Sequence, residues 1–240
     1  MPIQILAPDD DTTAFPPVEN ALIEPNGLLM AGGSLSPQRL IAAYRSGIFP
    51  WFEEGEPILW WSPDPRCVIW PDKLVIRRSL AKTLRRGHLE VTRNVAFAEV
   101  MRQCAKLRPG STGTWITPDM IRAYQKLHLY GIAQSTEIWQ DDKLVGGLYG
   151  ISLGGVFVGE SMFSEVSDAS KVALVHLAQS CDYQLIDCQL ETPHLLTMGA
   201  ENIPRHDYLG LLERYGDLST AVFSPDHPPL GVAGSSPPDL

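Results

Sequence analysis

Apolar side chains recur at every third or fourth position over several parts of the chain, and this spacing predicts helices. In the first helix, Leu40, Ile41 and Tyr44 share one face, Ser36 stands at the N-cap and Gly47 ends the helix. The same pattern predicts helices over residues 36–47, 77–87, 95–107, 117–131, 167–181 and 206–218.

The period changes to two between residues 136 and 163, where apolar and polar side chains alternate as they do along strands. Short turns at residues 141–143 and 152–155 divide this stretch into an antiparallel meander. A helix follows, with Cys181 expected on its buried face, and then one more strand, residues 185–190. Residues 191–205 are predicted to be mostly loop.

The last predicted strand carries two polar side chains on one face. Strand geometry places Asp187 and Gln189 on the same side, with Ile186 and Cys188 on the other. Polar groups among apolar neighbours have to be hydrogen-bonded, because each costs about 1–3 kcal/mol when it is buried without a partner. The pair is consistent with a structural role, in which it satisfies loop backbone, and with the polar end of an active site.

Length and composition predict a folded protein with one large domain or two modest ones, since 240 residues with 44% hydrophobic side chains can fill a real core. Prolines around residue 64 predict a boundary between a small N-terminal domain, residues 1–64, and a larger domain, residues 65–223. The proline-, glycine- and serine-rich residues 224–240 are predicted to be a disordered tail.

The cysteines and the apolar segments indicate in which cellular compartment the protein is expected. The four cysteines form no Cys-x-x-Cys pair and have no histidine at ligand spacing, which argues against zinc and for reduced thiols. No apolar run approaches the roughly 20 residues that cross a bilayer, and the N-terminus lacks a signal-peptide pattern. We expect a soluble cytoplasmic protein without a metal site.

A net charge of −9 makes the molecule as a whole repel nucleic acid, so an RNA partner needs a local basic surface. Residues 77–86 offer one. If they are helical, Arg78, Lys82, Arg85 and Arg86 lie on one face, with no acidic residue between them. Such a face is either a solvated surface or a binding site for phosphates.

Aromatic side chains crowd a proline-bounded segment in the first third of the chain. Trp51, Trp60 and Trp61 are typical either of a core cluster or of a surface on which a base stacks.

The chain lacks the usual signatures of a protein nucleophile, a catalytic metal or a nucleotide loop, such as Gly-x-Ser-x-Gly, His-Glu-x-x-His or a Walker sequence. This favours direct transfer between two bound substrates. The order of meander, helix and polar strand resembles the acyltransferase fold of the acetyl-coenzyme A-dependent N-acetyltransferases (GNAT enzymes). Their pyrophosphate loop is rich in glycine, whereas residues 163–171 contain no glycine and two acids, so coenzyme A is not expected and no cofactor is predicted.

Several longer motifs, in order along the chain, carry a more specific resemblance. From about Phe15 to Tyr208 the sequence is similar to the leucyl/phenylalanyl-tRNA–protein transferase family. The motifs are Pro-Asn-Gly-Leu-Leu (25–29), Tyr-Arg-Ser-Gly-Ile-Phe-Pro-Trp-Phe (44–52), Pro-Ile-Leu-Trp-Trp-Ser-Pro-Asp-Pro-Arg (57–66), Gly-Thr-Trp-Ile-Thr (113–117), Leu-Val-Gly-Gly-Leu-Tyr-Gly (144–150), Gly-Glu-Ser-Met-Phe-Ser (159–164) and Ile-Asp-Cys-Gln (186–189).

The resemblance implies an enzyme, an aminoacyltransferase. It moves leucine or phenylalanine, with methionine a further donor to test, from charged tRNA onto a protein that begins with Arg or Lys, and so creates an N-degron. It also implies an α+β fold, in which a small N-terminal domain packs on a GNAT-like C-terminal domain with a mixed, mostly antiparallel sheet flanked by helices. Its partners would be aminoacyl-tRNA and acceptor proteins, with no membrane.

Residue roles follow from the same resemblance. Trp51 and Trp115 would stack on the terminal adenosine, Glu160 would face the aminoacyl group or the cationic acceptor, and the basic face at residues 78–86 would hold tRNA phosphates. The remaining substrate-binding residues would be Leu148, Ser161, Met162, Phe163, Leu174 and Ile186.

The acceptor amine must lose a proton and attack the ester carbonyl. Gln189 is no general base at neutral pH, but it can position the amine or the developing oxyanion. Asp187 can orient Gln189 or take the proton itself, and the tRNA ribose hydroxyl is a third route. Two alternatives to the whole reading are a peptidoglycan-type aminoacyl-tRNA-dependent transferase and a non-catalytic tRNA-binding module.

Overall fold

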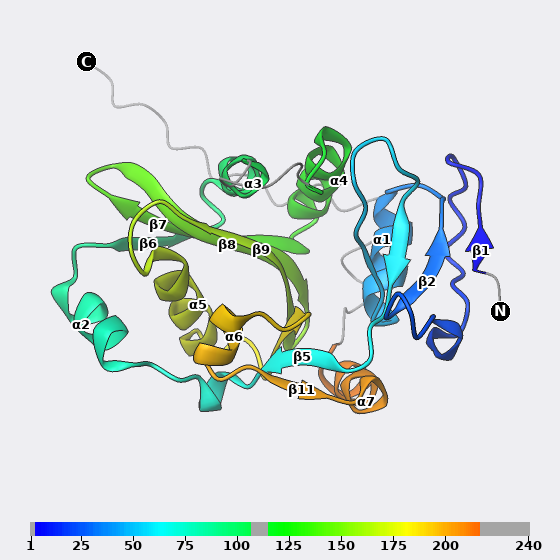
Figure 1. Ribbon diagram of the computed structural model, residues 1–240. Helices are drawn as coiled ribbons and strands as arrows, with labels where there is room; N and C mark the ends of the chain where they lie inside the picture. The colour runs from blue at the N-terminus through cyan, green and yellow to red at the C-terminus, as the bar shows by residue number, and fades with distance from the viewer. Residues whose placement is uncertain (1–2, 107–114, 217–240) are drawn as a thin grey trace, which may run out of the picture.

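A seven-stranded sheet lies at the centre of the computed structural model, which describes residues 3–106 and 115–216 (Figure 1). The strand order is β11-β5-β10-β9-β8-β7-β6, and within it only β9 and β10 run parallel. The predicted tail, residues 224–240, lies outside the described part of the chain. The strands are β5 (Arg66–Ile69), β6 (Glu90–Arg93), β7 (Ala133–Gln140), β8 (Lys143–Leu153), β9 (Val156–Ser164), β10 (Leu185–Gln189) and β11 (Glu201–Ile203).

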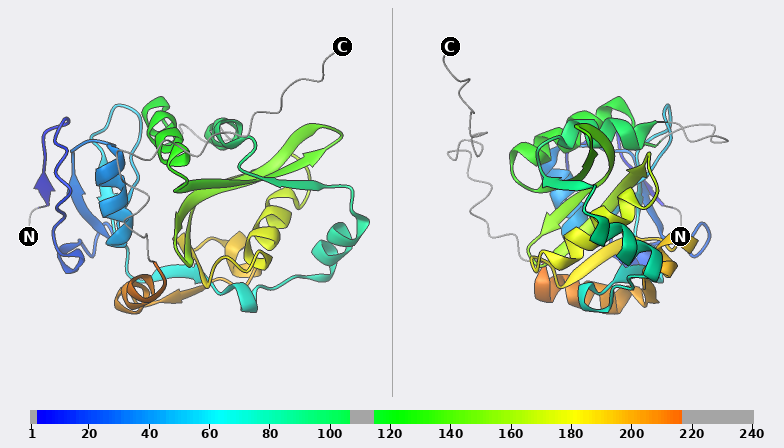
Figure 2. Two further views of the ribbon diagram at one scale, coloured as in Figure 1. Left: turned by 180° about the vertical axis from the view of Figure 1, so that it is seen from behind. Right: turned by 90° about the vertical axis from the view of Figure 1, so that its left-hand side faces the viewer.

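Helices cover both faces of this sheet. Helices α3 and α4 pack on one face and α5, which connects β9 to β10, packs on the other (Figures 1 and 2). A Cβ on Gly146 of β8 would lie 2.5 Å from the Ala169 Cβ, so glycine lets the start of α5 approach the sheet closely. The helices of this part are α2 (Arg78–Arg86), α3 (Phe97–Ala105), α4 (Pro118–Leu129), α5 (Ala169–Gln179), α6 (Pro193–Thr197), α7 (Arg205–Tyr215) and the 3₁₀ turn η2 (Pro71–Lys73).

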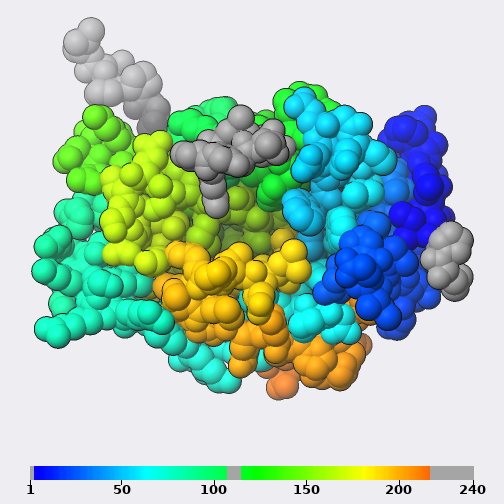
Figure 3. Space-filling view, in the orientation of Figure 1, coloured from blue at the N-terminus to red at the C-terminus, as the bar shows by residue number. Residues whose placement is uncertain are grey.

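A smaller N-terminal unit combines a four-stranded sheet, in the order β1-β2-β4-β3, with helix α1. It lies at the end of the molecule opposite α2, and α6 lies on the surface between them (Figure 3). One hydrophobic core joins the unit to the central sheet, because Tyr44 and Phe49 pack in the same cluster as Tyr124 and Tyr149. The elements are β1 (Gln4–Ile5), η1 (Val18–Asn20), β2 (Leu28–Ala31), α1 (Pro37–Arg45), β3 (Phe49–Pro50) and β4 (Leu59–Trp61).

Local signals in the sequence account for several of these boundaries. The Ser36 hydroxyl accepts a hydrogen bond from the Arg39 amide at the start of α1, and Thr117 caps α4 in the same way. Gly87 ends α2 in the left-handed conformation, with φ of 62°. The predicted helices and the predicted meander of β7, β8 and β9 are confirmed.

Two predictions are wrong. Residues 191–205 contain α6 and β11, because Thr192 caps a short helix and β11 pairs with β5. Cys181 is exposed rather than buried, since α5 ends at Gln179 and the chain turns away with a positive φ at Cys181. The strand predicted over residues 185–190 is confirmed as β10, which ends at Gln189.

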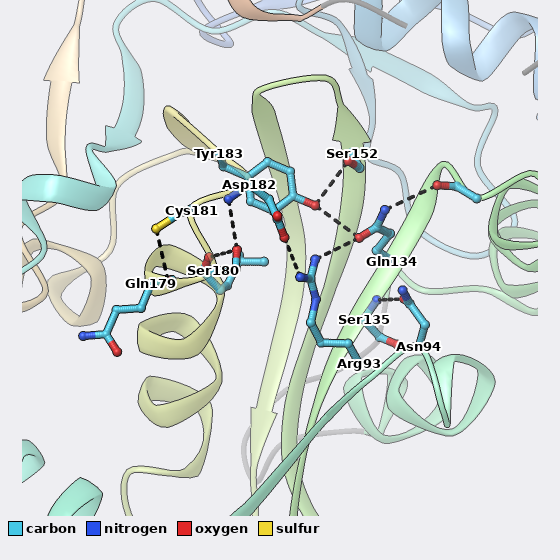
Figure 4. A network of polar contacts seen from close by, with 12 residues as sticks. Arg93, Asn94, Gln134, Ser135, Ser152, Gln179, Ser180, Cys181, Asp182 and Tyr183 are labelled. Carbon is cyan, nitrogen blue, oxygen red and sulfur yellow. Dashed lines mark hydrogen bonds and ion pairs between the residues drawn. The ribbon is translucent and has the colours of Figure 1, made fainter. Parts of the chain in front are cut away.

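A polar network joins strands β6, β7 and β8 to the turn after α5 (Figure 4). Arg93 of β6 pairs with Asp182 at 2.5 Å, and the Tyr183 hydroxyl donates to Gln134 of β7 and Ser152 of β8, each at 3.2 Å. The Arg93–Asp182 pair is substantially exposed, so its role is to fix the geometry of the turn more than to add stability. None of the described helices is long and apolar enough to cross a membrane.

Candidate active site

A cavity of about 1030 Å³ opens between the central sheet, α5, α6 and the N-terminal unit. Its volume suits an aminoacyl group with part of a nucleoside. Gln189 lies in its wall, and so does every residue predicted to bind the aminoacyl or nucleoside part of the substrate. These residues are Trp51, Trp115, Leu148, Glu160, Ser161, Met162, Phe163, Leu174 and Ile186. Asp187 and the basic residues of α2 do not line it.

The apolar wall follows from strand pairing. Leu148 of β8 lies opposite Met162 of β9, and Ile186 of β10 lies opposite Phe157, which also belongs to β9. Leu174 of α5 covers them, so strand and helix side chains enclose a dry surface that fits an apolar acyl side chain.

Asp187 lies behind this wall, completely buried, and all of its described partners are protein groups. Arg66 donates twice to it, from Nε at 2.8 Å and from Nη2 at 2.6 Å, and the Tyr208 hydroxyl donates at 2.7 Å. The Gln189 backbone amide donates to Oδ1 at 2.8 Å. Burial works to lower the pKa of Arg66, but the Asp187 carboxylate outweighs burial and raises it, so the guanidinium stays charged.

A β-bulge places Gln189 in the cavity. The register of β10 against β5 shifts between Asp187 and Gln189, and Gln189 has a φ of 63°. Cys188, the extra residue of the bulge, and Gln189 both border the cavity. The left-handed conformation costs a non-glycine residue on the order of 1 kcal/mol, and the bond from its amide to Asp187 helps to hold it.

Glu160 of β9 is the buried acid that faces the cavity, with 8% of its surface exposed. Tyr44 of α1 donates to it at 2.7 Å, Tyr124 of α4 donates at 3.1 Å, and the Gln189 side-chain amide donates at 2.8 Å. The two tyrosine hydroxyl oxygens are also in contact with each other. Glu160 therefore joins the N-terminal unit, the helical layer and the bulge at one carboxyl group.

Burial raises the pKa of Glu160 to about 7, and the tyrosine hydrogen bonds offset only part of this rise. The carboxyl group is thus poised between its charged and neutral forms at physiological pH. Tyr149, beside it in the wall, is completely buried, and among the described residues its hydroxyl has no hydrogen-bond partner. Such a hydroxyl is available to a ligand.

Sequence reasoning missed the residues that hold Asp187 and Glu160 in place. Arg66, Tyr208, Tyr44 and Tyr124 are all buried and all bonded to one of the two acids. A signal existed for the tyrosines, since a hydroxyl on the inner face of an amphipathic helix needs a polar partner.

The tryptophans divide between the two expected roles. Trp60 is completely buried and donates to the Gly32 carbonyl, so it belongs to the core of the N-terminal unit. Trp51 is 43% exposed, contacts Trp61 at a ring separation of 5.6 Å and borders the cavity with the half-buried Trp115. The open rings of Trp51 and Trp115 are surfaces on which a base can stack.

The basic side chains of α2 form a separate surface. Arg78, Lys82, Arg85 and Arg86 are exposed, whereas Leu80 packs inward beneath them. Among the described residues none of the four takes part in a salt bridge, so their charges face solvent together. A search of the described residues for His, Cys, Asp and Glu groups able to hold a metal finds none.

Comparison with known proteins identifies the family of this chain. The family model "Leucyl/phenylalanyl-tRNA protein transferase" matches residues 68–213, and the model of that family's N-terminal domain matches residues 33–64. Proteins named leucyl/phenylalanyl-tRNA–protein transferase from Nitrosomonas eutropha and Azoarcus sp. are each 58% identical over 208 residues, which is 85% of this chain and 89% and 88% of theirs. The Pseudomonas aeruginosa protein is 55% identical over 206 residues, 85% of this chain and 91% of its own.

A solved GCN5-related N-acetyltransferase from Kribbella flavida is 11% identical, with a TM-score of 0.33 over 68% of this chain and 59% of its own; a likeness this weak adds nothing to the assignment. The sequence matches alone place the protein among the aminoacyltransferases. Within that class, the chain belongs to the leucyl/phenylalanyl-tRNA–protein transferase family.

Proposed function

We propose that the protein transfers leucine or phenylalanine from aminoacyl-tRNA to the N-terminal Arg or Lys of acceptor proteins. The observation that carries this proposal is the apolar cavity that ends at the hydrogen-bonded Glu160–Gln189 pair, in a chain of this family. Membership of the family favours this reaction over a peptidoglycan-type transferase and over a non-catalytic tRNA-binding module. Because charged tRNA is its donor, the proposed reaction takes place in the cytoplasm.

The donor end of tRNA fits the cavity in two parts. Its terminal adenine stacks on Trp51 and Trp115, where one stacked base contributes about 1–3 kcal/mol. The apolar side chain of the amino acid enters the pocket of Leu148, Met162 and Ile186. A branched or aromatic side chain buries its surface there, whereas a charged one would lose its hydration without a partner.

The acceptor amine attacks the ester carbonyl carbon beside Gln189. A C–N bond forms, the bond from the carbonyl carbon to the ribose oxygen breaks, and the proton that the amine loses ends on the ribose oxygen. The Gln189 amide nitrogen is already bonded to Glu160, so its carbonyl oxygen is free to accept a hydrogen bond from the amine. The ionised form of Glu160 attracts the cationic acceptor and, with a pKa of about 7, is matched to accept the proton.

Asp187 acts as a positioning residue in this scheme. Its oxygens accept from Arg66, Tyr208 and the Gln189 amide, and it does not border the cavity. These contacts favour the orienting role over direct proton transfer. The basic face of α2 binds tRNA phosphates and gives an acidic protein a local attraction for RNA.

A transfer assay tests the proposal directly. Purified protein should move radiolabelled leucine from Leu-tRNA onto a peptide that begins with Arg, with Phe-tRNA and Met-tRNA measured beside it. Failure to transfer any of them while tRNA binding is intact would overturn the proposed function. With the donor fixed, an acceptor screen of the Arg peptide against a cell-wall precursor separates this reaction from the peptidoglycan-type one.

A further inference from the structure

Two cysteines meet at the bulge beside Gln189. Cys67 of β5 is completely buried and lies opposite Gln189 in the strand register. Cys188 is the additional residue that the bulge inserts between Asp187 and Gln189, so it stands beside Gln189 against the same position of β5. The thiols of Cys67 and Cys188 are close enough that each shifts the pKa of the other.

The two thiols differ in access. Cys188 is partly exposed and borders the cavity, so a small molecule can reach it, whereas Cys67 has no solvent-exposed surface. Their mutual interaction lowers the pKa of Cys67 and, together with burial, raises the pKa of Cys188. Neighbouring residues of paired strands lie at a separation that a disulfide can span, with Cα atoms about 4.5–5.5 Å apart.

We propose that Cys67 and Cys188 form a reversible disulfide that switches the transferase site off, with a small-molecule disulfide such as oxidised glutathione as the oxidant. Cys188 loses its proton and attacks one sulfur of the small disulfide, whose S–S bond breaks and releases one thiol. The Cys67 thiolate then attacks the Cys188 sulfur and expels the second thiol. The protein loses two electrons and two protons, and the small disulfide is reduced to two thiols.

The position of the pair explains why oxidation would stop transfer. A disulfide brings the two sulfur atoms to about 2 Å and draws Cys188 towards β5. Gln189 is the next residue, and its side chain holds Glu160 through a 2.8 Å hydrogen bond. A misplacement of about 1 Å at such a group can cost on the order of 100-fold in rate. This second half of the inference rests on the proposed function.

Peptide mapping tests whether the bond forms. The full-length protein is reduced, equilibrated with oxidised glutathione, alkylated and digested. We expect a peptide pair linked through Cys67 and Cys188, while Cys104 and Cys181 remain unlinked to each other. The Cys67→Ala variant should instead accumulate glutathione on Cys188, because the second thiol is missing. Wild-type protein that carries only mixed disulfides, or none, would overturn the inference.

Activity after oxidation, divided by activity after reduction, tests the switch. This ratio should be about 0.1 or less in wild type and in a Cys104→Ser, Cys181→Ser double variant. Dithiothreitol should return the oxidised proteins to the activity of the reduced ones. The Cys188→Ser variant should keep a ratio near one, since it cannot form the bond. A linked protein that transfers leucine at the reduced rate would overturn the switch. Reduced protein that never transfers leucine would contradict the proposed function instead and leave the mapping result standing.

Discussion

At Glu160, burial and hydrogen bonding act on one carboxyl group in opposite directions, and burial prevails. The Glu160→Gln substitution keeps the shape of the side chain but removes its charge. We expect kcat/KM for transfer to an Arg peptide to fall on the order of 100-fold, because the cationic acceptor loses its counter-charge and its proton acceptor. Steady-state kinetics at fixed Leu-tRNA measure this, and an unchanged kcat/KM would remove Glu160 from the mechanism.

The pH profile separates Glu160 from the substrate. In wild type, kcat/KM should rise through pH about 7 as Glu160 ionises, and again as the acceptor α-amine, with a pKa of about 7.7–8.0, loses its proton. In Glu160→Gln only the second rise should remain. Glu99, whose pKa is lowered by Gln103 and Arg102 on the surface, offers a matched control, since Glu99→Gln should keep both rises.

Stability should respond to the same group. Glu160 binds its proton more tightly in the folded chain than in the unfolded chain, where its pKa is near 4.5. Its contribution is therefore fully present below pH about 4.5 and is lost as pH rises towards about 7. Relative to Glu160→Gln, the free energy of unfolding of wild type should fall over this window by up to about 3 kcal/mol, as measured by urea denaturation. Parallel curves for the two proteins would contradict the raised pKa.

Asp187 presents the opposite case, a buried acid whose charge is compensated. Asp187→Asn leaves the Arg66 guanidinium buried without its counter-ion, which costs about 3–5 kcal/mol of stability. Because the Gln189 amide then bonds a neutral carbonyl oxygen in place of a carboxylate, its anchor weakens, and turnover should fall much more than tRNA affinity. Tyr208→Phe removes one hydrogen bond and keeps the ion pair, so its effects should be milder. Equal losses of turnover and affinity in Asp187→Asn would indicate misfolding and not a positioning role.

The sequence predicts Asp187 and Gln189 but not the residues around them. Two polar residues in a strand among apolar neighbours are visible in the alternation. Their partners Arg66 and Tyr208 come from β5 and α7, far away in the chain, and only the folded sheet brings them together. The prediction that both polar side chains face the same way is confirmed, because their partners Tyr208 and Glu160 lie on the side of one hydrophobic cluster, whereas Ile186 packs in the other. The bulge between them could not be predicted, since it depends on how β10 pairs with β5.

Helix α2 carries a local positive charge in a chain whose net charge is −9. Lys82→Glu with Arg85→Glu should weaken tRNA binding and lower the magnitude of the slope of log K against log salt by about two, since each phosphate contact contributes about one. Arg102→Glu with Arg122→Glu, on α3 and α4, makes the same change in net charge elsewhere and should leave the slope nearly unchanged. Equal slopes for wild type and the α2 variant would remove this face from the binding site.

Elements with strong local signals were predictable, and elements defined by long-range pairing were not. Helix α2 and the meander of β7 to β9 carry their period and their turns within the segment itself. The short strands β6 and β11 lack such a period and exist because β7 and β5 offer edges to pair with. This is the usual limit of pattern reading, since strand formation depends on neighbours across the sheet.

For the whole molecule, the resemblance to the family implied the α+β class, and the two sheets with their covering helices confirm it. The boundary near residue 64 was predicted from the position of prolines in the sequence. In the structure, the segments on its two sides pack in one hydrophobic core. A single hydrophobic cluster contains Leu40 and Trp60 of the N-terminal unit together with Val156 and Tyr149 of the large sheet. The Tyr44–Glu160 hydrogen bond joins the same two parts at the cavity.

This shared core predicts that the N-terminal unit and the sheet domain unfold together. Separation would expose the buried faces of Tyr44 and Tyr124 and break the bond to Glu160, so neither side is stable enough alone to populate an intermediate. In a variant with Trp70, Trp115 and Trp139 replaced by Phe, tryptophan fluorescence reports on the N-terminal unit through Trp51, Trp60 and Trp61, whereas far-ultraviolet circular dichroism reports on the whole chain. In urea the two signals should give one transition with the same midpoint. A fluorescence midpoint at lower urea concentration would mean that the N-terminal unit unfolds first. The cavity would then be assembled from two independently stable domains.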